Sequence, residues 1–349
     1  MPRLPKLSYV LLSHNREKYI RAAIESAFAQ DYEGELEYIF SDDCSTDRTF
    51  EIIKECVAAY KGGRRVVVTQ PPTNQHLAGN TNHAVKFVES DWIVRADDDD
   101  LSSVDRCSII GRAIAEHPEA TFVFTRKENF TDTNADEALQ RALCKRDSIP
   151  QPRILDARDA NTIPLQWFRI GQCLHQVWST EHFRKFGDLP KEGYWVDDVI
   201  AFWRCCVLGV GLDLDVVTSY IRQGSNNMCR GGDDGGNGYQ AIMRLEQFND
   251  RYQNQTLAPL RTSYRQIKDY IAGHCSPEAR EQSAPFIRAL EHNLATRELL
   301  CTYWRKGTLN RIRIARKLGY RGISGMLRCL PMPIYARLLS TFRTLKGKS

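Results

Sequence analysis

Four consecutive aspartates, residues 97–100, are the part of this sequence best suited to chemistry. They follow an apolar stretch, Trp92-Ile93-Val94, that predicts a buried strand. Adjacent carboxylates repel one another, so such a run is costly unless a cation neutralises it. Carboxylate oxygens suit Mg²⁺ or Mn²⁺, with waters and substrate phosphates completing the coordination shell. The run therefore indicates a metal-assisted site for a phosphorylated ligand, and a solvated acidic loop is the alternative.

A second acidic pair, Asp42-Asp43, also follows a predicted strand, within the segment 41–47 of sequence Ser-Asp-Asp-Cys-Ser-Thr-Asp. Two carboxylates at a strand end can accept hydrogen bonds from a nucleotide base or a ribose. Serine, threonine and aspartate are also common helix N-caps, so a turn with Asp47 as the cap is the alternative. The motif alone favours the turn, whereas its place beside the 97–100 run favours a nucleotide site.

A third pair, Asp197-Asp198, begins an apolar run that predicts a helix from about 196 to 208. A positioned carboxylate can take the proton of a hydroxyl as that hydroxyl attacks. Paired acids also stabilise a helix N-terminus, and both roles can hold together. Arg222 is a candidate for bidentate phosphate binding, with an ordinary exposed arginine as the alternative. Three histidines show no spacing typical of a metal site and are expected to be structural: His14, His83 and His175.

The elements that position these residues alternate between strand and helix over the first 126 residues. Apolar stretches end just before two of the acidic clusters, and segments with helical spacing lie between them. This alternation predicts a parallel, doubly wound α/β sheet, in which ligands bind outside the carboxyl ends of the strands. The predicted strands are 7–13, 36–41, 65–69, 91–96 and 121–126, with a first helix over 16–30 and helix N-caps at Asn15, Asp47, Asn80 and Ser102 or Ser103.

Residues 7–106 resemble the nucleotide-binding half of the family 2 glycosyltransferases, which have the GT-A fold. The resemblance implies that Asp43 contacts the base and that Asp97 to Asp99 form the DXD metal site, with Asp99 as the direct ligand. Cys44 stands where the family usually has a small residue such as glycine, which implies a less tight turn. The order and spacing of five segments carry the resemblance: Ser13-His14-Asn15-Arg16 after the opening strand, Ser26-Ala27-Phe28-Ala29-Gln30, residues 42–47, Gly79-Asn80-Thr81-Asn82, and residues 95–100 with Asp105-Arg106.

The segment 195–204 resembles the family's acidic pair, which is followed six residues later by an arginine, here Arg204. By that resemblance Asp198 is the catalytic base, and Asp197 is expected to contact phosphate or acceptor. Residues 220–227 resemble a Tyr-Arg-x-His type segment of the family, with Gln223 or Ser225 in place of the missing histidine, which implies a phosphate or acceptor contact by Arg222. The expected metal ligands are Asp97 and Asp99, for Mn²⁺ or Mg²⁺. The expected nucleotide-binding residues are Ser13, Asn15, Asp42, Asp43, Asn80, Asp97 and Asp98.

The resemblance implies an inverting, metal-dependent glycosyltransferase. It would move a sugar from a nucleotide-sugar donor to a hydroxyl of a glycan or lipid-linked acceptor in cell-surface polysaccharide synthesis. Family analogy favours a UDP-linked donor, and GDP- and dTDP-linked donors stay open. A nucleotidyltransferase is the main alternative, although that class usually opens with a glycine-rich loop, and residues 13–17 contain no glycine. A non-catalytic nucleotide-binding or membrane-surface protein is a third interpretation. A processive synthase is disfavoured because the sequence lacks a Gln-x-x-Arg-Trp segment and an apolar run of membrane-spanning length.

Charge is distributed unevenly along the 349 residues, whose formal net charge is +5. From Leu299 onward there are twelve Lys or Arg and no acid, whereas the preceding residues carry a net charge of −7. Basic segments with interleaved aromatics favour an anionic membrane surface as partner, and a helical region with a solvated basic face is the alternative. No motif indicates nucleic-acid binding. Eleven cysteines without a CxxC pair suit a reducing compartment, so a cytoplasmic protein, peripheral on the cytosolic face of a membrane, is expected.

Three regions are predicted from these patterns. Residues 1–230 form the catalytic domain, with a nucleotide-sugar-binding half over 1–126 and an acceptor-binding half over 127–230. Within the second half, residues 127–164 are polar and weakly periodic and are expected to be a long loop with short helices. The glycine-rich stretch 231–238 is a break. Residues 239–349 form a helical, basic C-terminal region.

Overall fold

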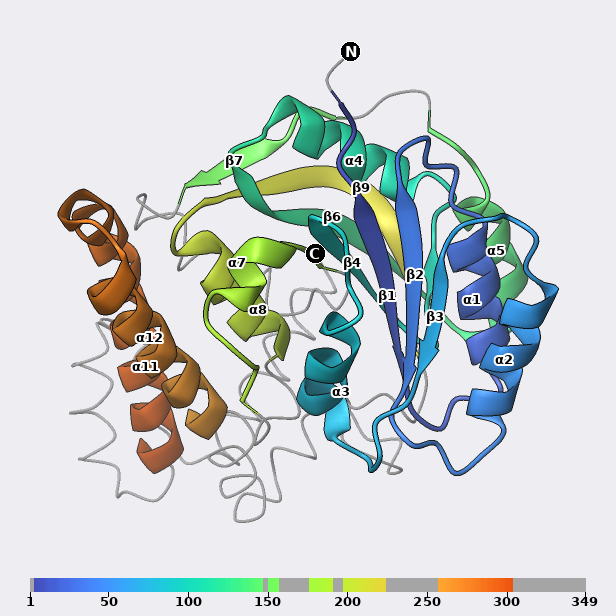
Figure 1. Ribbon diagram of the computed structural model, residues 1–349, viewed down its shortest axis with the longest axis horizontal. Coiled ribbons are helices and arrows are strands. Elements are labelled where there is room, and N and C mark those ends of the chain that lie inside the picture. The colour runs from blue at the N-terminus through green and yellow to red at the C-terminus, as the bar shows by residue number, and fades with distance from the viewer. Residues whose placement is uncertain (1–2, 147–149, 157–175, 191–196, 224–256, 304–349) are drawn as a thin grey trace, which may run out of the picture. The chain divides into compact units, whose positions relative to one another are not determined.

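The computed structural model of the protein describes residues 3–146, 150–156, 176–190, 197–223 and 257–303 (Figure 1). Two compact units are distinguished along the chain, Met1–Ala289 and Leu290–Ser349. The first unit holds the β-sheet and all the predicted site residues. The domain boundaries expected from the sequence, 1–230 and 239–349, stay a prediction, and the glycine-rich break and the chain after 303 lie outside the described residues.

The N-terminal part alternates strand and helix as predicted. Strand β1 lies between β2 and β4 and is parallel to both, while β3 pairs parallel with β2 on the far side. The chain order therefore reverses at β1, which makes the gap between β1 and β4 the topological switch point of the sheet. The elements are β1 (Leu7–Ser13), α1 (Ile20–Phe28), β2 (Leu36–Asp42), α2 (Thr49–Ala59), β3 (Val66–Thr69), α3 (His76–Val85) and β4 (Trp92–Asp97).

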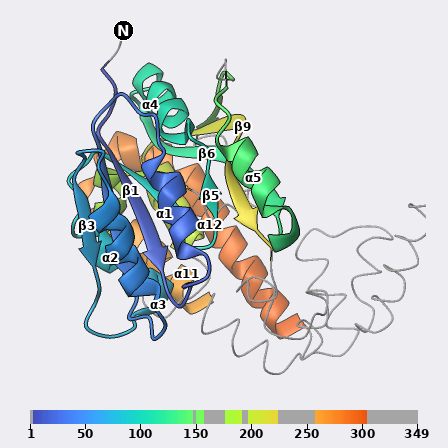
Figure 2. The same ribbon diagram turned by 90° about the vertical axis from the view of Figure 1, so that its right-hand side faces the viewer.

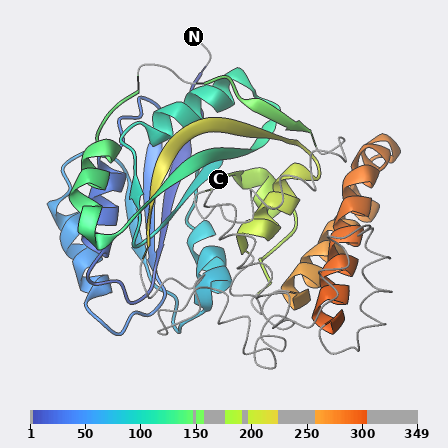
Figure 3. The same cartoon turned by 180° about the vertical axis from the view of Figure 1, so that it is seen from behind.

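The remaining strands extend the same sheet in the order β3-β2-β1-β4-β8-β6-β9-β5, with β7 paired to β9. The long strands β6 and β9 run side by side and parallel (Figure 3), whereas β5, β7 and β8 are antiparallel to their neighbours. The predicted doubly wound, mostly parallel sheet with C-terminal helices is thus confirmed. The elements are β5 (Leu101–Ser102), α4 (Arg106–Glu116), β6 (Ala120–Phe130), η1 (Asp132–Asn134), α5 (Ala135–Ala142), β7 (Arg153–Asp156), β8 (Val177–Ser179), α7 (Thr180–Arg184), α8 (Asp197–Cys206), β9 (Val210–Arg222), α11 (Ala258–His274) and α12 (Pro277–Tyr303).

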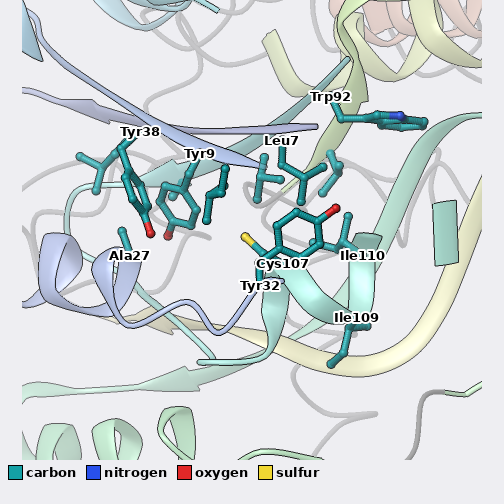
Figure 4. Packing of buried hydrophobic residues seen from close by; sticks show 14 of the residues in the cluster. Leu7, Tyr9, Ala27, Tyr32, Tyr38, Trp92, Cys107, Ile109 and Ile110 are labelled. Carbon is teal, nitrogen blue, oxygen red and sulfur yellow. The ribbon is translucent and has the colours of Figure 1, made fainter. Parts of the chain in front are cut away.

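One face of the sheet is covered by α1, α2 and α4, of which α1 and α2 lie side by side in Figure 2. Alternate residues of each strand point to this face, because side chains alternate along a strand. Leu7 and Tyr9 of β1 and Tyr38 of β2 enter a continuous apolar cluster together with Cys107 and Ile110 of α4 (Figure 4). Burial of this surface is what holds the helices on the sheet.

The opposite face packs against α3, α7 and α8. On β6, Phe122 and Phe124 point to this face, and both rings contact Phe202 of α8, at 5.5 and 5.4 Å between centroids. Trp178 of β8 stacks on Phe183 of α7 at 5.1 Å. The aromatic packing anchors α8, the helix that begins with the predicted catalytic pair.

All four helices with a predicted N-cap begin at other residues than the capping patterns predict. Helix α2 begins at Thr49 with Arg48, not Asp47, as its N-cap, and α4 begins at Arg106 with Asp105 as its N-cap, while Ser102 belongs to β5.

The two helices with an asparagine as the predicted cap differ most. Helix α1 begins at Ile20 rather than after Asn15, because Asn15 has a left-handed backbone with φ of 52° and a turn follows it. Helix α3 begins at His76, so Asn80 lies inside the helix and is not its N-cap. In both cases the asparagine side chain bonds to a neighbouring loop or strand, and this contact competes with capping.

The expected long loop after residue 126 is also wrong in its first part. Strand β6 continues to Phe130, because Lys127–Phe130 pair with Ser219–Arg222 of β9. Helix α5 then packs Ala138 and Ala142 against Phe130 and Tyr220 in a small second apolar cluster. Part of the expected loop, residues 157–164, lies outside the described residues.

Among the helices in the described ranges, none combines the length and the apolar character that crossing a bilayer requires.

Candidate active site

The ends of three adjacent strands bring the two acidic clusters to one edge of the sheet. In register, Ser13 of β1 lies beside Asp42 of β2, and Leu12 of β1 lies beside Asp97 of β4. Two main-chain hydrogen bonds tie these ends together: the Asp43 N–H donates to the Ser13 carbonyl at 2.8 Å, and the His14 N–H donates to Asp98 Oδ2 at 2.8 Å. The clusters therefore meet at the switch point, where ligands bind in such sheets.

Asp42, at the end of β2, is buried and fully engaged with donors. Its carboxylate accepts hydrogen bonds from the Ser45 N–H at 2.9 Å, from Gln70 Nε2 at 2.8 Å and from the Ser45 hydroxyl. Cys44 within this turn has φ of 56° and adopts the left-handed conformation that glycine takes freely. The carboxylate of Asp42 holds this turn closed, and the expected looser turn relative to the family stays a prediction.

Asp43, the predicted base contact, is also buried. The Gln75 N–H donates to its Oδ1 at 2.7 Å, and the ring of His14 bonds to its carbonyl at 3.0 Å. Burial raises the pKa of the Asp43 carboxyl, and the Gln75 N–H partly offsets that rise. The side chain is thereby oriented at the switch point, and its contact with a base stays a prediction.

Two other predicted nucleotide-binding residues, Asn15 and Asn80, fasten loops and elements to one another through their side chains. Asn15 Oδ1 accepts from the Thr46 N–H at 2.8 Å, which joins the β1 and β2 loops. Asn80 bonds both to the Ser41 hydroxyl at 2.5 Å and to the Ser41 carbonyl at 3.0 Å, which joins α3 to β2. These contacts explain why the residue types are needed, and nucleotide contacts by Ser13, Asn15 and Asn80 stay predictions.

Residues 97–100 form an acidic turn directly after β4. Asp97 Oδ1 lies 3.2 Å from Arg95 Nη2, and Arg16 Nε lies 3.6 Å from Asp98 Oδ1 and 3.5 Å from Asp99 Oδ2. Burial, followed by repulsion from Asp99, raises the pKa of Asp98 well above its usual range. Burial and the next carboxylate raise the pKa of Asp99 to about 6.

Asp100 and Arg222 close the other side of the acidic turn. The Arg222 N–H donates to Asp100 Oδ1 at 2.7 Å, and burial raises the pKa of Asp100 to about 7. The Arg222 guanidinium donates through Nε to the Asp99 carbonyl at 3.0 Å and through Nη1 to Asp132 at 2.6 Å. It lies 4.4 Å from the Tyr19 ring centroid. Arg222 is 7% exposed, so the interpretation of an ordinary exposed arginine is wrong; phosphate binding by it stays a prediction.

Two arginines that the sequence analysis left without a role, the buried Arg106 and the partly buried Arg146, hold the strand before the turn and the segment after it. Arg106 Nη2 donates to the Arg95 carbonyl at 2.8 Å, and Arg106 Nη1 donates to Ser102 Oγ at 2.9 Å. Arg146 binds Asp105 through its N–H at 2.9 Å and through Nη1 at 2.5 Å. Arg95 and Arg106 stood in segments quoted for the family resemblance, but only the fold shows which main-chain atoms Arg106 holds.

The donor set of the acidic turn fits a divalent cation bound through few protein ligands. In the described ranges, no three His, Cys, Asp or Glu side chains form a closed metal-binding group. Mg²⁺ and Mn²⁺ sites at phosphates usually take one or two carboxylates, with waters and phosphate oxygens supplying the rest. Buried carboxylates that repel each other gain from such an ion, so Asp97 and Asp99 are retained as predicted ligands.

Helix α8 begins at Asp197, so the predicted acidic pair opens a helix, but the side chains of Asp197 and Asp198 lie outside the described residues. Arg204, six residues after Asp198, is buried and donates to the Gly187 and Asp188 carbonyls at 2.5 and 2.9 Å. Burial lowers the pKa of Arg204 to about 10. Arg204 thus fixes the helix to the segment that precedes it.

Of the three histidines expected to be structural, two are described. The His14 ring bonds to the Asp43 carbonyl, and His83 Nε2 lies 2.7 Å from Thr69 Oγ1. Burial lowers the pKa of His83. His175 lies outside the described residues.

Residues 8–173 match the family model described as glycosyl transferase family 2. Among curated proteins, EpsE of Bacillus subtilis is 39% identical over 98 residues, which are 28% of this chain and 34% of EpsE. The poly(ribitol-phosphate) beta-N-acetylglucosaminyltransferase TarS of Staphylococcus aureus is 32% identical over 114 residues, which are 32% of this chain and 19% of TarS. The chain thus matches only about a third of the length of EpsE and about a fifth of that of TarS.

Two solved structures share the fold. The structure of S. aureus TarS 1-349 in complex with UDP-GlcNAc has a TM-score of 0.53 at 17% identity. The superposition covers 97% of this chain and 92% of the TarS chain. The mannosyltransferase PcManGT from Pyrobaculum calidifontis, in complex with GDP-Man and Mn²⁺, has a TM-score of 0.52 at 15% identity. The superposition covers 99% of this chain and 82% of the PcManGT chain. The family match spans β1 to β4 and the acidic turn, and the architecture agrees with it. Residues 8–173 therefore belong to glycosyl transferase family 2, within a chain that has the GT-A fold.

Proposed function

We propose that the protein is an inverting, divalent-metal-dependent glycosyltransferase. It takes a nucleotide sugar, UDP-linked in the first instance, and transfers the sugar to a hydroxyl of a glycan or lipid-linked acceptor in cell-surface polysaccharide synthesis. The observation that supports this most directly is the meeting of Asp43 and the acidic turn at the β1–β4 switch point, joined by the bonds from Asp43 to Ser13 and from His14 to Asp98.

The arrangement suits a donor with a base at one end and a diphosphate at the other. Asp43 is oriented for a ring N–H of the base, and Asp97 and Asp98 lie toward the ribose and diphosphate. Asp97 and Asp99 would hold Mn²⁺ or Mg²⁺, which would supply positive charge to stabilise the departing nucleoside diphosphate. The sequence matches at 32% to TarS and the Mn²⁺ complex of PcManGT support this division.

The base that deprotonates the acceptor is assigned to Asp198. Asp198 belongs to the first turn of α8, where the positive end of a helix favours negative charge, and α8 is anchored by Arg204 and by aromatic packing. Attack by the acceptor oxygen on the face opposite the diphosphate inverts the anomeric carbon. The proton of the hydroxyl passes to Asp198, and the nucleoside diphosphate leaves with its bonding electron pair.

The partners proposed are thus a nucleotide-sugar donor, a glycan or lipid-linked acceptor, and an anionic membrane surface for the basic chain after Leu299, on the cytosolic side. Most of that basic chain lies outside the described residues, so this part rests on its charge alone. Vesicles with and without phosphatidylserine test it: cosedimentation only with the anionic vesicles, lost in 0.5 M salt, is expected.

The experiment for the proposed function is thermal stabilisation by UDP, GDP and dTDP, each with and without Mn²⁺, followed by assay of the matching nucleotide sugars. A ligand at 100 times its dissociation constant stabilises by about 2.7 kcal/mol. Metal-dependent stabilisation by one nucleotide, and release of the nucleoside diphosphate on turnover, are expected. Release of pyrophosphate would favour a nucleotidyltransferase instead, and binding without turnover on any acceptor would favour a non-catalytic protein.

A further inference from the structure

Arg16, in the loop between β1 and α1, places a positive charge against the acidic turn. Its Nε lies 3.6 Å from Asp98 Oδ1 and 3.5 Å from Asp99 Oδ2. These distances are longer than a good hydrogen bond, so the attraction is mainly between charges. One guanidinium thereby partly offsets the repulsion between two carboxylates, the buried Asp98 and the partly buried Asp99, of which Asp99 is the predicted metal ligand.

The main chain of Arg16 is held independently of its side chain. Its N–H donates to Thr49 Oγ1 at 2.7 Å, and its carbonyl accepts from the N–H groups of Tyr19 and Ile20, at 2.9 Å each. Replacement of the guanidinium should therefore leave the loop and the start of α1 in place.

Two other arginines beside the turn are built in differently. The side chain of Arg95 is 1% exposed and that of Arg222 is 9% exposed, and Arg222 is also bonded to Asp132 and to the Asp99 carbonyl. The side chain of Arg16 is 23% exposed. Arg95 and Arg222 are thus fixed parts of the frame. The Arg16 guanidinium donates through Nη1 to the exposed Asn15 carbonyl at 3.1 Å, a bond that water can replace, so it can move off the carboxylates into solvent.

We infer that Arg16 is a displaceable counter-cation, which weakens binding of the metal alone and couples metal binding to binding of the donor diphosphate. A divalent cation at Asp99 is repelled by the guanidinium when no anion is present. A diphosphate brings negative charge that attracts both cations, so Arg16 can turn from the carboxylates to a phosphate oxygen. Metal and nucleotide then bind cooperatively, and the coupling is reciprocal. The inference rests on the proposed function.

The test measures Mn²⁺ binding without nucleotide, as free Mn²⁺ in an electron paramagnetic resonance titration, and UDP binding in saturating Mn²⁺. The variants are Arg16→Gln, Arg16→Lys and, as a control of equal charge change, Arg21→Gln, whose side chain pairs with Glu55 on the exposed surface of α1 and α2. Removal of one charge at this distance from a partly exposed site should change the binding constant about tenfold.

Arg16→Gln is expected to bind Mn²⁺ alone about tenfold more tightly and UDP with Mn²⁺ about tenfold more weakly. Arg16→Lys keeps the charge and should resemble the wild type, as should Arg21→Gln. Circular dichroism and the melting temperature of each variant check the fold.

If Arg16→Gln binds Mn²⁺ as the wild type does and keeps the wild-type coupling of Mn²⁺ and UDP, Arg16 is not a displaceable counter-cation. The proposed function is then unaffected. Weaker UDP binding with unchanged Mn²⁺ affinity makes Arg16 a simple phosphate ligand and also overturns it. Absence of Mn²⁺ and nucleotide binding in the wild type and in every variant instead removes the proposed function, and the inference with it.

Discussion

Asp42 at the end of β2 and Asp98 in the turn after β4 lie on either side of β1, and both are buried. Asp42 accepts hydrogen bonds from Gln70 Nε2 and from the N–H and hydroxyl of Ser45. Asp98 accepts one main-chain N–H, from His14, and otherwise has Arg16 at 3.6 Å and two adjoining carboxylates. The first carboxylate builds a loop, whereas the second keeps unfavourable charge that a ligand can neutralise. The two carboxylates, at the ends of β2 and β4, thus differ in how far the protein itself satisfies them, and nucleotide binding by either one stays a prediction.

The largest effect is expected from a residue outside both regions. Asp198→Asn should lower the transfer rate by roughly 10² to 10⁴, because the acceptor hydroxyl loses its general base. Metal-dependent stabilisation by UDP should stay at the wild-type value, since neither strand-end cluster is changed. Full activity in this variant would mean that another residue is the base.

Asp99→Asn is the direct test of the acidic turn. The metal-dependent part of the stabilisation by UDP, about 2.7 kcal/mol at 100 times the dissociation constant, should disappear. With a chelator present, the variant should unfold at equal or higher temperature than the wild type, because one repelling charge is gone. Thermal melts at pH 8 with EDTA and with Mn²⁺ measure both effects, and retention of the metal-dependent shift would show that Asp99 is not a ligand.

Asp42→Asn should lower the stability of the protein without metal, whereas Asp99→Asn should leave it equal or raise it. The amide cannot accept from all three donors of Ser45 and Gln70, so a loss of about 2 kcal/mol in the free energy of unfolding is expected. Urea denaturation in EDTA measures it. If Asp42→Asn and Asp99→Asn shifted stability in the same direction by similar amounts, the division between a structural and a ligand-binding carboxylate would be wrong.

The smallest effect is expected at Asp132, which supports Arg222 from the far side. Its side chain is half exposed, so Asp132→Asn should cost about 0.5 kcal/mol of stability. The variant should also weaken UDP binding slightly, because Arg222 holds the Asp99 carbonyl less firmly. Lys18→Gln removes the other cation paired with Asp132 and serves as the control. Equal loss of UDP affinity in both variants would argue against transmission through Arg222.

Much of the frame was accessible from sequence because apolar periodicity is a local property. The strands at 7–13, 36–41 and 91–96 and their parallel order follow from buried runs separated by amphipathic helices. The two acidic clusters fall at strand ends, and neighbouring parallel strands end at the same edge. Residues 97–100 and Asp43 could therefore be assigned to one site.

The helix starts could not be obtained in the same way. Asn15 and Asn80 have the side chains of good N-caps, but Asn15 binds the Thr46 N–H and Asn80 binds Ser41. A capping preference of about 1 kcal/mol is easily outweighed by buried bonds between elements distant in sequence.

The sequence by itself determined the fold class and the edge of the sheet at which a ligand is expected, since hydrophobic patterns and strand ends depend on consecutive residues. Only the tertiary structure decided which carboxylates are satisfied and which cations face the rest. Arg16 and Arg222 reach the same turn from loops and strands far apart in the chain. Pairing of charges depends on distance and burial, and both exist only once the sheet has assembled.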